Sequence, residues 1–216
     1  MTASARELVD SVRRDLAPQE DQNRLVPQAS EGKVARSTLA ALAAEEHRIV
    51  ASDWRSFLTL AANSVDEATR EYFSGLAQGE GVALNALPAL AGALGMDADA
   101  VRNYQPTAGC QSYPAYLAWL ALNADPSEVV VAVTANFAAW GSYCADMTAA
   151  LREHYGLDDA SCAFFDFFAT PAPEIEKQAI AAVQAGIDAG RVEESRVREY
   201  GRLFQSYELM FWNSLV

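Results

Sequence analysis

The sequence predicts an all-helical fold, and three kinds of observation support this prediction. Helix-start signals recur along the chain: Ser64 and Glu67, for example, have the spacing of a capping box. Glycines stand where helices would end, at Gly156 and Gly190. The one run with strand-like composition, residues 129–131, leads into an alanine-rich stretch that favours a buried helix.

The elements follow in order from these signals. Residues 1–17 alternate charged side chains with Leu and Val, as an amphipathic helix does. Asp125 and Pro126 form a cap and a first-turn proline, which opens a long helix that ends before Gly156. The sequence predicts helices near residues 4–16, 23–31, 35–63, 65–77, 79–94, 112–124, 126–154, 173–189 and 191–214.

The breaks between these helices are short. The two longest, residues 105–109 and 168–173, have neither the length nor the flexibility of a domain linker. We therefore expect one domain over residues 1–216.

Composition and charge limit the binding partners and the cellular location that we expect for this protein. Hydrophobic residues make up 51% of the chain, and the formal charge of −13 repels phosphate, so we expect no nucleic-acid partner and no membrane partner. The longest apolar stretch, Val129–Gly141, is shorter than the ~20 residues of a membrane span. There is no signal-peptide pattern, and three cysteines lack CxxC spacing, which together predict a cytoplasmic protein.

Two carboxylates lie on helix faces that should be apolar. Asp53 shares a face with Phe57, and Glu208 shares one with Phe211. Burial raises the pKa of such groups, which makes them candidates for acid/base catalysis or for binding a polar ligand. The alternative is an acid at the edge of its apolar stripe, or one paired with an arginine such as Arg55.

The helix that begins at Asp125 carries polar and aromatic groups in its middle. Asn136 is followed by Trp140 and Tyr143 at four- and seven-residue spacings, on the same face. An amide and two flat rings with polar tips suit a pocket for a small heteroaromatic ring. The alternative is an asparagine bonded to nearby backbone, beside two core aromatics.

Metal binding has little support in the sequence. His47 and His154 are the only histidines, and neither belongs to an HxxxH or ExxH pattern. Glu45, Glu46 and His47 are adjacent, but neighbouring residues on a helix point in different directions. We expect no metal and no cofactor, and His154 is better explained as a cation at a helix C-terminus.

Three segments resemble the TenA/thiaminase II family, whose members have a heme-oxygenase-like helical fold. Residues 51–58 resemble its Q-D-x-x-Y-L segment, residues 112–117 its S-Y-T-x-Y segment, and residues 207–212 its Y-E-x-x-F-W segment. The resemblance implies a heme-oxygenase-like multi-helix bundle. It also implies that Asp53 binds a pyrimidine and that Glu208 is the acid/base residue.

At the position of the family's nucleophilic cysteine, this sequence has a different residue. Counting forward from Tyr113 without a gap places Asn136 at the cysteine and Trp140 at a following tyrosine. A further pocket tyrosine falls among residues 169–171. A carboxamide cannot act as an attacking thiolate.

These observations lead to a TenA-like protein that binds an aminopyrimidine or thiamine-related ligand. Glu208 and Asp53 are the candidate catalytic residues, with Glu208 activating water. The candidate ligand-binding residues are Phe57, Tyr113, Asn136, Trp140, Tyr143 and Phe211. Cys110 or Cys144 taking over as nucleophile, a metal-dependent oxygenase of the same fold, and a non-catalytic binding or regulatory protein are the alternatives. The resemblance also implies a homo-oligomer, either a dimer or a tetramer.

Overall fold

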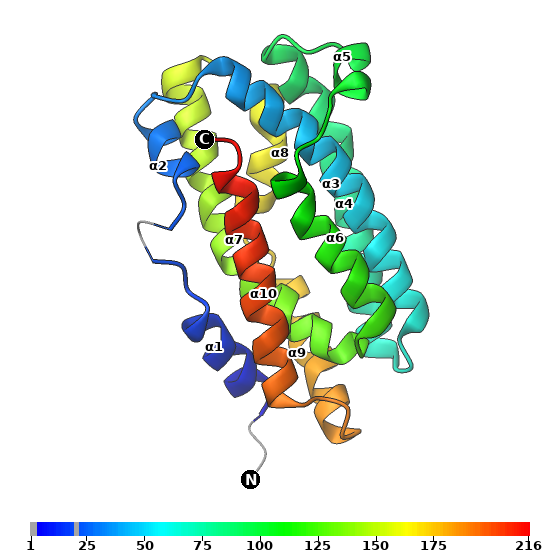
Figure 1. Cartoon of the computed structure of the whole chain (residues 1–216). Helices are drawn as coiled ribbons and strands as arrows, with labels where there is room; N and C mark the ends of the chain where they lie inside the picture. Colours follow the sequence, from blue (N-terminus) through cyan, green and yellow to red (C-terminus); the bar gives the residue numbers. More distant parts are fainter. Residues whose placement is uncertain (1–3, 20–21) are drawn as a thin grey trace.

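The computed structural model describes residues 4–19 and 22–216, and within these residues it contains ten α-helices and no strand (Figure 1). The helices are α1 (Ala5–Asp15), α2 (Leu25–Ser30), α3 (Arg36–Asn63), α4 (Glu67–Ala93), α5 (Ala98–Asn103), α6 (Ala108–Asn123), α7 (Pro126–Tyr155), α8 (Asp159–Ala169), α9 (Pro173–Asp188) and α10 (Glu194–Asn213). The all-helical prediction is confirmed.

The helix map needs three corrections. The predicted helices at 65–77 and 79–94 are one continuous helix, α4, because Gly79 does not interrupt it. Helices α5 and α8 were not predicted, although each begins at an aspartate cap, Asp97 and Asp158 respectively. Helix α6 begins four residues earlier than expected, at Ala108 rather than at residue 112, since Thr107 caps its first turn.

The caps were predicted with mixed success. Asp125 accepts from the Ser127 amide, and Gly156 has the left-handed backbone expected after α7. Ser64, in contrast, does not open α4. It is the C-cap of α3, where its hydroxyl donates to the Leu60 carbonyl, and Asp66 caps α4 instead.

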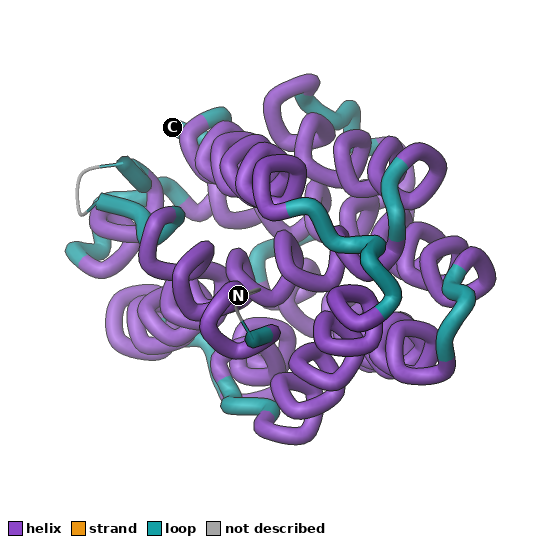
Figure 2. Tube along the Cα trace, turned by 90° about the horizontal axis from the view of Figure 1, so that it is seen from below, coloured by secondary structure: helices purple, strands orange, loops and turns teal. Residues whose placement is uncertain are grey.

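The five long helices α3, α4, α6, α7 and α10 run roughly along the long axis of the molecule (Figure 1). Helices α1 and α9 lie at one end, and α2, α5 and α8 lie towards the other. Seen from below, many of the helices are viewed nearly end-on, and loops join their ends (Figure 2). Helix α7 is the most central, because every residue from Pro126 to Asn136 is buried.

The buried residues form two apolar clusters stacked along this axis. One joins α1 and α9 to the adjacent ends of the long helices, and the other joins α2 and α8 to the opposite ends. Phe57 belongs to the first cluster and Phe211 to the second, while Tyr113 packs against both. The junction of the two clusters is where polar groups enter the interior.

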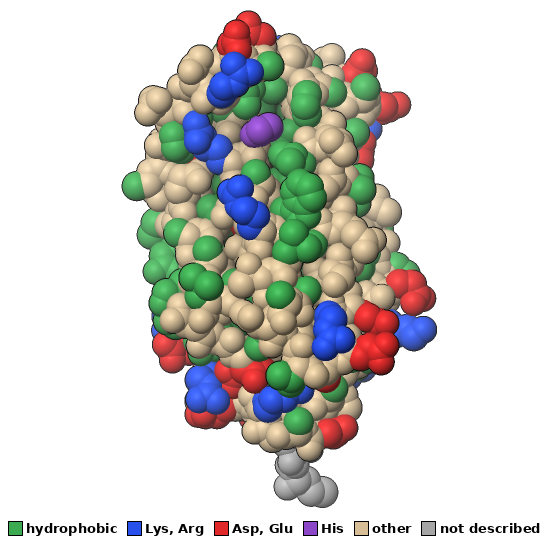
Figure 3. Space-filling model, turned by 90° about the vertical axis from the view of Figure 1, so that its right-hand side faces the viewer, with side chains coloured by type: hydrophobic (Ala, Val, Ile, Leu, Met, Phe, Trp, Pro, Cys, Tyr) green, Lys and Arg blue, Asp and Glu red, His purple; other side chains and the backbone are tan. Residues whose placement is uncertain are grey.

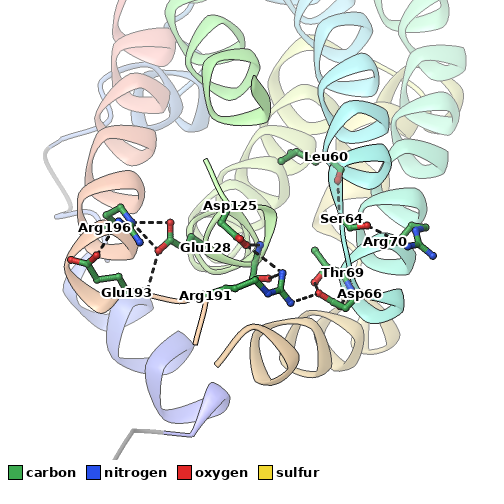
Figure 4. A network of polar contacts seen from close by, with 11 residues as sticks. Leu60, Ser64, Asp66, Thr69, Arg70, Asp125, Glu128, Arg191, Glu193 and Arg196 are labelled. Atoms are coloured by element: carbon green, nitrogen blue, oxygen red, sulfur yellow. Dashed lines mark hydrogen bonds and ion pairs between the residues drawn. The ribbon is translucent and has the colours of Figure 1, made fainter. Parts of the chain in front are cut away.

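A polar network closes the end of the bundle near α9 (Figure 4). Arg191 contacts Asp66 at 2.6 Å and donates to the Ser127 hydroxyl at 3.0 Å, which ties the α9–α10 loop to the starts of α4 and α7. Arg196 contacts Glu128 at 3.0 Å, and Glu128 is only 1% exposed. The chain thus supplies a cation to this buried carboxylate.

No helix in the described part of the chain is long and apolar enough to cross a membrane. The molecular face drawn in Figure 3 carries most of its charged side chains at the two ends, with mainly uncharged groups between them. Several large apolar side chains of α3 and α6 are exposed, namely Trp54, Leu58, Trp119 and Leu122.

Candidate functional site

A cavity lies at the junction of the two apolar clusters. Its lining consists of the carboxyl groups of Glu46, Asp53, Glu80 and Glu208 and of the side chains of Ile49, Val50, Phe57, Tyr113, Phe137, Trp140, Phe168 and Phe211. Its volume is about 30 Å³, which is room for roughly one or two water molecules. A ring-sized ligand therefore requires side-chain movement. Phe137, Trp140 and Phe168 are only half-buried and form the part of the wall nearest the surface.

Glu208 is the most fully bonded acid of the cavity. It is 2% exposed, and Asn136 Nδ2 donates to its Oε2 in a short hydrogen bond. Trp212 Nε1 donates to Oε1 at 3.2 Å. Burial raises the pKa of Glu208 to about 7, although these two hydrogen bonds act in the opposite direction. Such a pKa suits a group that gives and takes protons near neutral pH.

Asn136 is held by a second amide. Its Nδ2 also donates to Gln205 Oε1 at 3.1 Å, and Gln205 lies one turn before Glu208 on α10. The alternative in which Asn136 bonds to nearby backbone is not what the structure shows. Asn136 instead orients the carboxylate of Glu208 from across the helix interface.

The other three acids lack this support. Glu46, Asp53 and Glu80 are 2%, 5% and 8% exposed, and Glu46 Oε1 and Asp53 Oδ1 have no hydrogen-bond partner. Burial raises the pKa of each well above its ordinary value, and nearby carboxylates add to the rise for Glu46 and Glu80. Arg55 is exposed, and no ion pair among the described residues reaches these acids.

The neighbours of Glu46 on α3 have different surroundings. Glu45 accepts from the Thr107 amide at 2.7 Å and from Gln111 at 2.6 Å, on the side of α3 that faces α6. His47 lines a separate hollow between α3, α4 and α5, beside Arg48. Of these consecutive residues, only Glu46 points into the cavity.

The aromatic side chains surround the acids. The Tyr113 ring lies 4.7 Å from that of Phe204, and burial together with the nearby carboxylates raises the pKa of its phenol well above the usual range. Trp140 lies 5.4 Å from Trp212 and 5.6 Å from Phe168, measured between ring centroids. Phe168 stands next to residues 169–171, where the sequence placed a further pocket group.

The predicted site residues come together with one exception. Six of them line the cavity, namely Asp53, Phe57, Tyr113, Trp140, Glu208 and Phe211. Asn136 reaches it through Glu208. Tyr143 packs edge-on against Trp212, at 5.7 Å between centroids, and is not among the lining residues.

The histidines, cysteines and acids of the described residues include no group of three or more arranged to hold a metal ion. The carboxyl groups of the cavity line it from α3, α4 and α10 without converging on one point. His154 lies in the last turn of α7, as expected, and contacts the Ser30 carbonyl at 2.9 Å.

A model of the TENA/THI-4/PQQC family matches residues 24–216. The chain belongs to this family. No curated protein matches its sequence significantly. The predicted resemblance to TenA proteins is therefore confirmed by the family match, which spans all the helices that line the cavity.

Solved structures support the same fold. A TenA family transcription regulator from Silicibacter sp. TM1040 is 14% identical, with a TM-score of 0.76 over 96% of both chains. A putative TenA-like thiaminase from Sulfolobus solfataricus P2 is 14% identical, with a TM-score of 0.64 over 100% of this chain and 96% of that one. A domain with a heme oxygenase-like fold from Shewanella denitrificans OS217 is 13% identical, with a TM-score of 0.59 over 95% and 90% of the two chains. The heme-oxygenase-like fold class is confirmed.

Sequence reasoning missed Glu46 and Glu80 as members of the site in this TenA-family protein. The helical spacing of both residues in the sequence would have identified them. Glu46 precedes Asp53 by two helical turns, and Glu80 shares an apolar face of α4 with Leu76 and Leu87.

Proposed function

We propose that this TenA-family protein binds a small heteroaromatic ligand, an aminopyrimidine or a thiamine-related compound, in the cavity between α3, α6, α7 and α10. The observation that carries the proposal is the placement of Glu208 and Asp53, both buried, in one aromatic-lined cavity. An exocyclic amine supplies the hydrogen-bond donor that the Asp53 carboxyl lacks, and the raised pKa of Asp53 favours a protonated carboxyl that donates to a ring nitrogen. Tyr113 and Phe57 offer faces on which a ring can stack.

The geometry also supports hydrolysis without a cysteine. In this reaction, Glu208 takes a proton from water while the water oxygen bonds to the ligand carbon that carries an amine. The carbon–nitrogen bond then breaks, and Glu208 returns the proton to the departing amine. Asn136 orients Glu208 and takes no part as a nucleophile, because its amide nitrogen is not basic.

Calorimetry tests the binding step. We expect heat on titration with 4-amino-2,5-dimethylpyrimidine or thiamine, and reduced affinity in Asp53→Asn. Glu71→Gln, an exposed carboxylate on α4, is the matched control and keeps the affinity of the unaltered chain. A folded sample that gives no heat with any aminopyrimidine or with thiamine would overturn the proposal.

Product analysis separates the enzyme from a non-catalytic binding protein. Proton NMR of the ligand over time reports any loss of its amine. If the protein is a hydrolase, Glu208→Gln lowers the rate by about 10²-fold or more. If the same substitution changes only affinity, the non-catalytic alternative is correct.

Assembly into a homo-oligomer and a cytoplasmic location are part of the same proposal. The exposed apolar side chains of α3 and α6 are compatible with a subunit interface. Light scattering coupled to size-exclusion chromatography gives the mass directly. A mass of one 23.3 kDa chain at micromolar concentration would contradict the oligomer.

A further inference from the structure

A second hollow lies on the outside of the bundle, between α3, α4 and α5. Its volume is about 420 Å³, compared with about 30 Å³ for the central cavity, and the two spaces share no lining residue. Sites for small molecules commonly have volumes of about 300 to 1,000 Å³. The outer hollow therefore has the size of a ligand site without any movement of side chains.

Much of the lining of this hollow is apolar. Leu87 and Ala91 line it from α4 and are almost fully buried, while Met96 and Val101 are half-buried and line it from the α4–α5 connection and from α5. Helix α5 contains no buried residue, so its own side chains do not fill the space. The lining thus offers an apolar surface to the apolar part of a ligand.

The charged groups of the lining are mainly basic. They are His47, Arg48, Arg102 and one acid, Asp97. Asp97 caps α5, where it accepts from a backbone amide at 2.8 Å, and Arg102 pairs with Asp99 at 2.6 Å. Among the described residues, no ion pair involves Arg48 and no hydrogen bond involves the ring of His47. The hollow therefore has a cation and a polar ring that the fold leaves without an acidic partner.

Arg48 also has a hydrogen-bond donor without an acceptor. Its Nη2 donates to the carbonyl oxygens of Tyr104 at 2.9 Å and Arg102 at 3.3 Å, which ties the end of α5 to α3. Its Nε is buried and has no partner. Among the partly buried arginines that the structure describes, only Arg13 also has such an Nε, and two carboxylates lie within 3.7 Å of Arg13. Arg48 has no carboxylate to offset its charge.

We infer that this hollow binds a small organic anion, a carboxylate or a phosphate monoester that carries an apolar group. Arg48 and His47 bind the anionic group, because a guanidinium makes charge-assisted hydrogen bonds to either anion and an imidazole donates an N–H. The apolar group packs against Leu87 and Val101. The formal charge of −13 repels anions from most of the molecule, so binding of an anion requires a local basic site of this kind. The inference does not depend on the ligand of the central cavity.

Calorimetry on the full chain, in about 0.15 M salt, tests the inference with hexanoate, hexyl phosphate, hexylammonium and acetate. We expect the better of the two six-carbon anions to bind roughly tenfold tighter or more than hexylammonium, which has the same chain and the opposite charge. Acetate should bind at least about tenfold more weakly than hexanoate, because it lacks the chain that contacts the apolar lining. The comparison of hexanoate with hexyl phosphate identifies the preferred anionic group.

Two variants locate the site. Arg48→Met should weaken binding of the better anion by roughly tenfold or more. Ala98→Phe, at an exposed lining residue of α5, places a ring in the hollow and should weaken binding to a similar degree while Arg48 keeps its bonds to α5. Arg55→Met, which removes an exposed arginine of α3 outside the lining, is the matched control and should leave the affinity unchanged, as should Asp53→Asn in the central cavity. Thermal melting by circular dichroism verifies that each variant is folded.

Several results would overturn the inference. The hollow is not an anion site if neither six-carbon anion binds, if hexylammonium binds as tightly as they do, or if the affinity survives in Arg48→Met or in Ala98→Phe. Equal affinities for acetate and hexanoate would show that no apolar group is bound. None of these results bears on the proposed ring site, which titration with aminopyrimidines tests separately.

Discussion

Replacing Glu208 with glutamine should make the stability of this protein less sensitive to pH. The pKa of Glu208 rises from 4.5 to about 7 on folding, because burial disfavours its ionised form. One pKa unit corresponds to about 1.4 kcal/mol, so ionised Glu208 lowers the free energy of unfolding by about 3 kcal/mol relative to the protonated form. Glutamine stays neutral and avoids this cost.

The sign of the effect follows from proton binding. Between pH 4.5 and 7 the folded chain keeps a proton on Glu208 that the unfolded chain has lost. The stability that the protonated Glu208 side chain contributes is therefore fully present below pH 4.5, and it is lost as the pH rises through about 7. Relative to the unaltered chain, Glu208→Gln should gain about 3 kcal/mol between pH 4 and pH 8.

Urea unfolding followed by circular dichroism at several pH values measures this difference. The absolute difference at any one pH includes altered hydrogen bonds to Asn136 and Trp212, but its change with pH reports ionisation. Glu71→Gln, which removes an exposed carboxylate of α4, is the matched control. Parallel stability profiles for the unaltered chain and Glu208→Gln would refute the assignment of a buried, high-pKa acid at this position.

Three further predictions concern the scaffold. Gly186→Ala should destabilise the protein by about 1–3 kcal/mol, since a Cβ there would lie 2.5 Å from that of Ser127. Gly81→Ala has open space around the new Cβ and should stabilise α4 by about 0.5–1 kcal/mol. Chemical denaturation measures the free energy of unfolding of both variants. Arg196→Met should cost about 1–3 kcal/mol by the same measurement, because it leaves buried Glu128 with one backbone donor, and an unchanged midpoint would contradict this. The three buried cysteines should resist a thiol reagent at pH 8 in the native state and react together in urea, and rapid native labelling would show that one is exposed.

The sequence was sufficient to predict the fold because its strongest signals are local. Caps such as Asp125 and a glycine stop such as Gly156 depend on a few neighbouring residues. The short helix α5 was missed because its six residues contain no buried side chain and thus no apolar period. Ser64 was misassigned because a hydroxyl followed by an acid fits either a helix start or the end of the preceding helix.

The site was predictable only where motif and face agreed. Asp53 and Glu208 stood out because an acid interrupted an apolar stripe within a family-like segment. Glu46 interrupts a stripe too, but it is one of two adjacent glutamates, and only the packing of α6 shows that Glu45 serves the fold while Glu46 faces the cavity. The position of Tyr143 behind Trp212 depends on the angle between α7 and α10, which no local pattern records.

The resemblance to the TenA motifs places Asn136 where that family has its nucleophilic cysteine, and the acids of the cavity disfavour a thiolate at this position. A thiol is nucleophilic as a thiolate, and neighbouring carboxylates oppose the loss of its proton. Cys144, two turns after Asn136 on α7, illustrates this: burial raises the pKa of its thiol, and the charges of Glu46 and Glu208 raise it further. Asn136 contacts Glu208 directly, so a thiol at position 136 would lie near the same carboxylate. In this cavity an asparagine that donates to Glu208 stabilises the ionised carboxylate, which a protonated thiol would do only weakly.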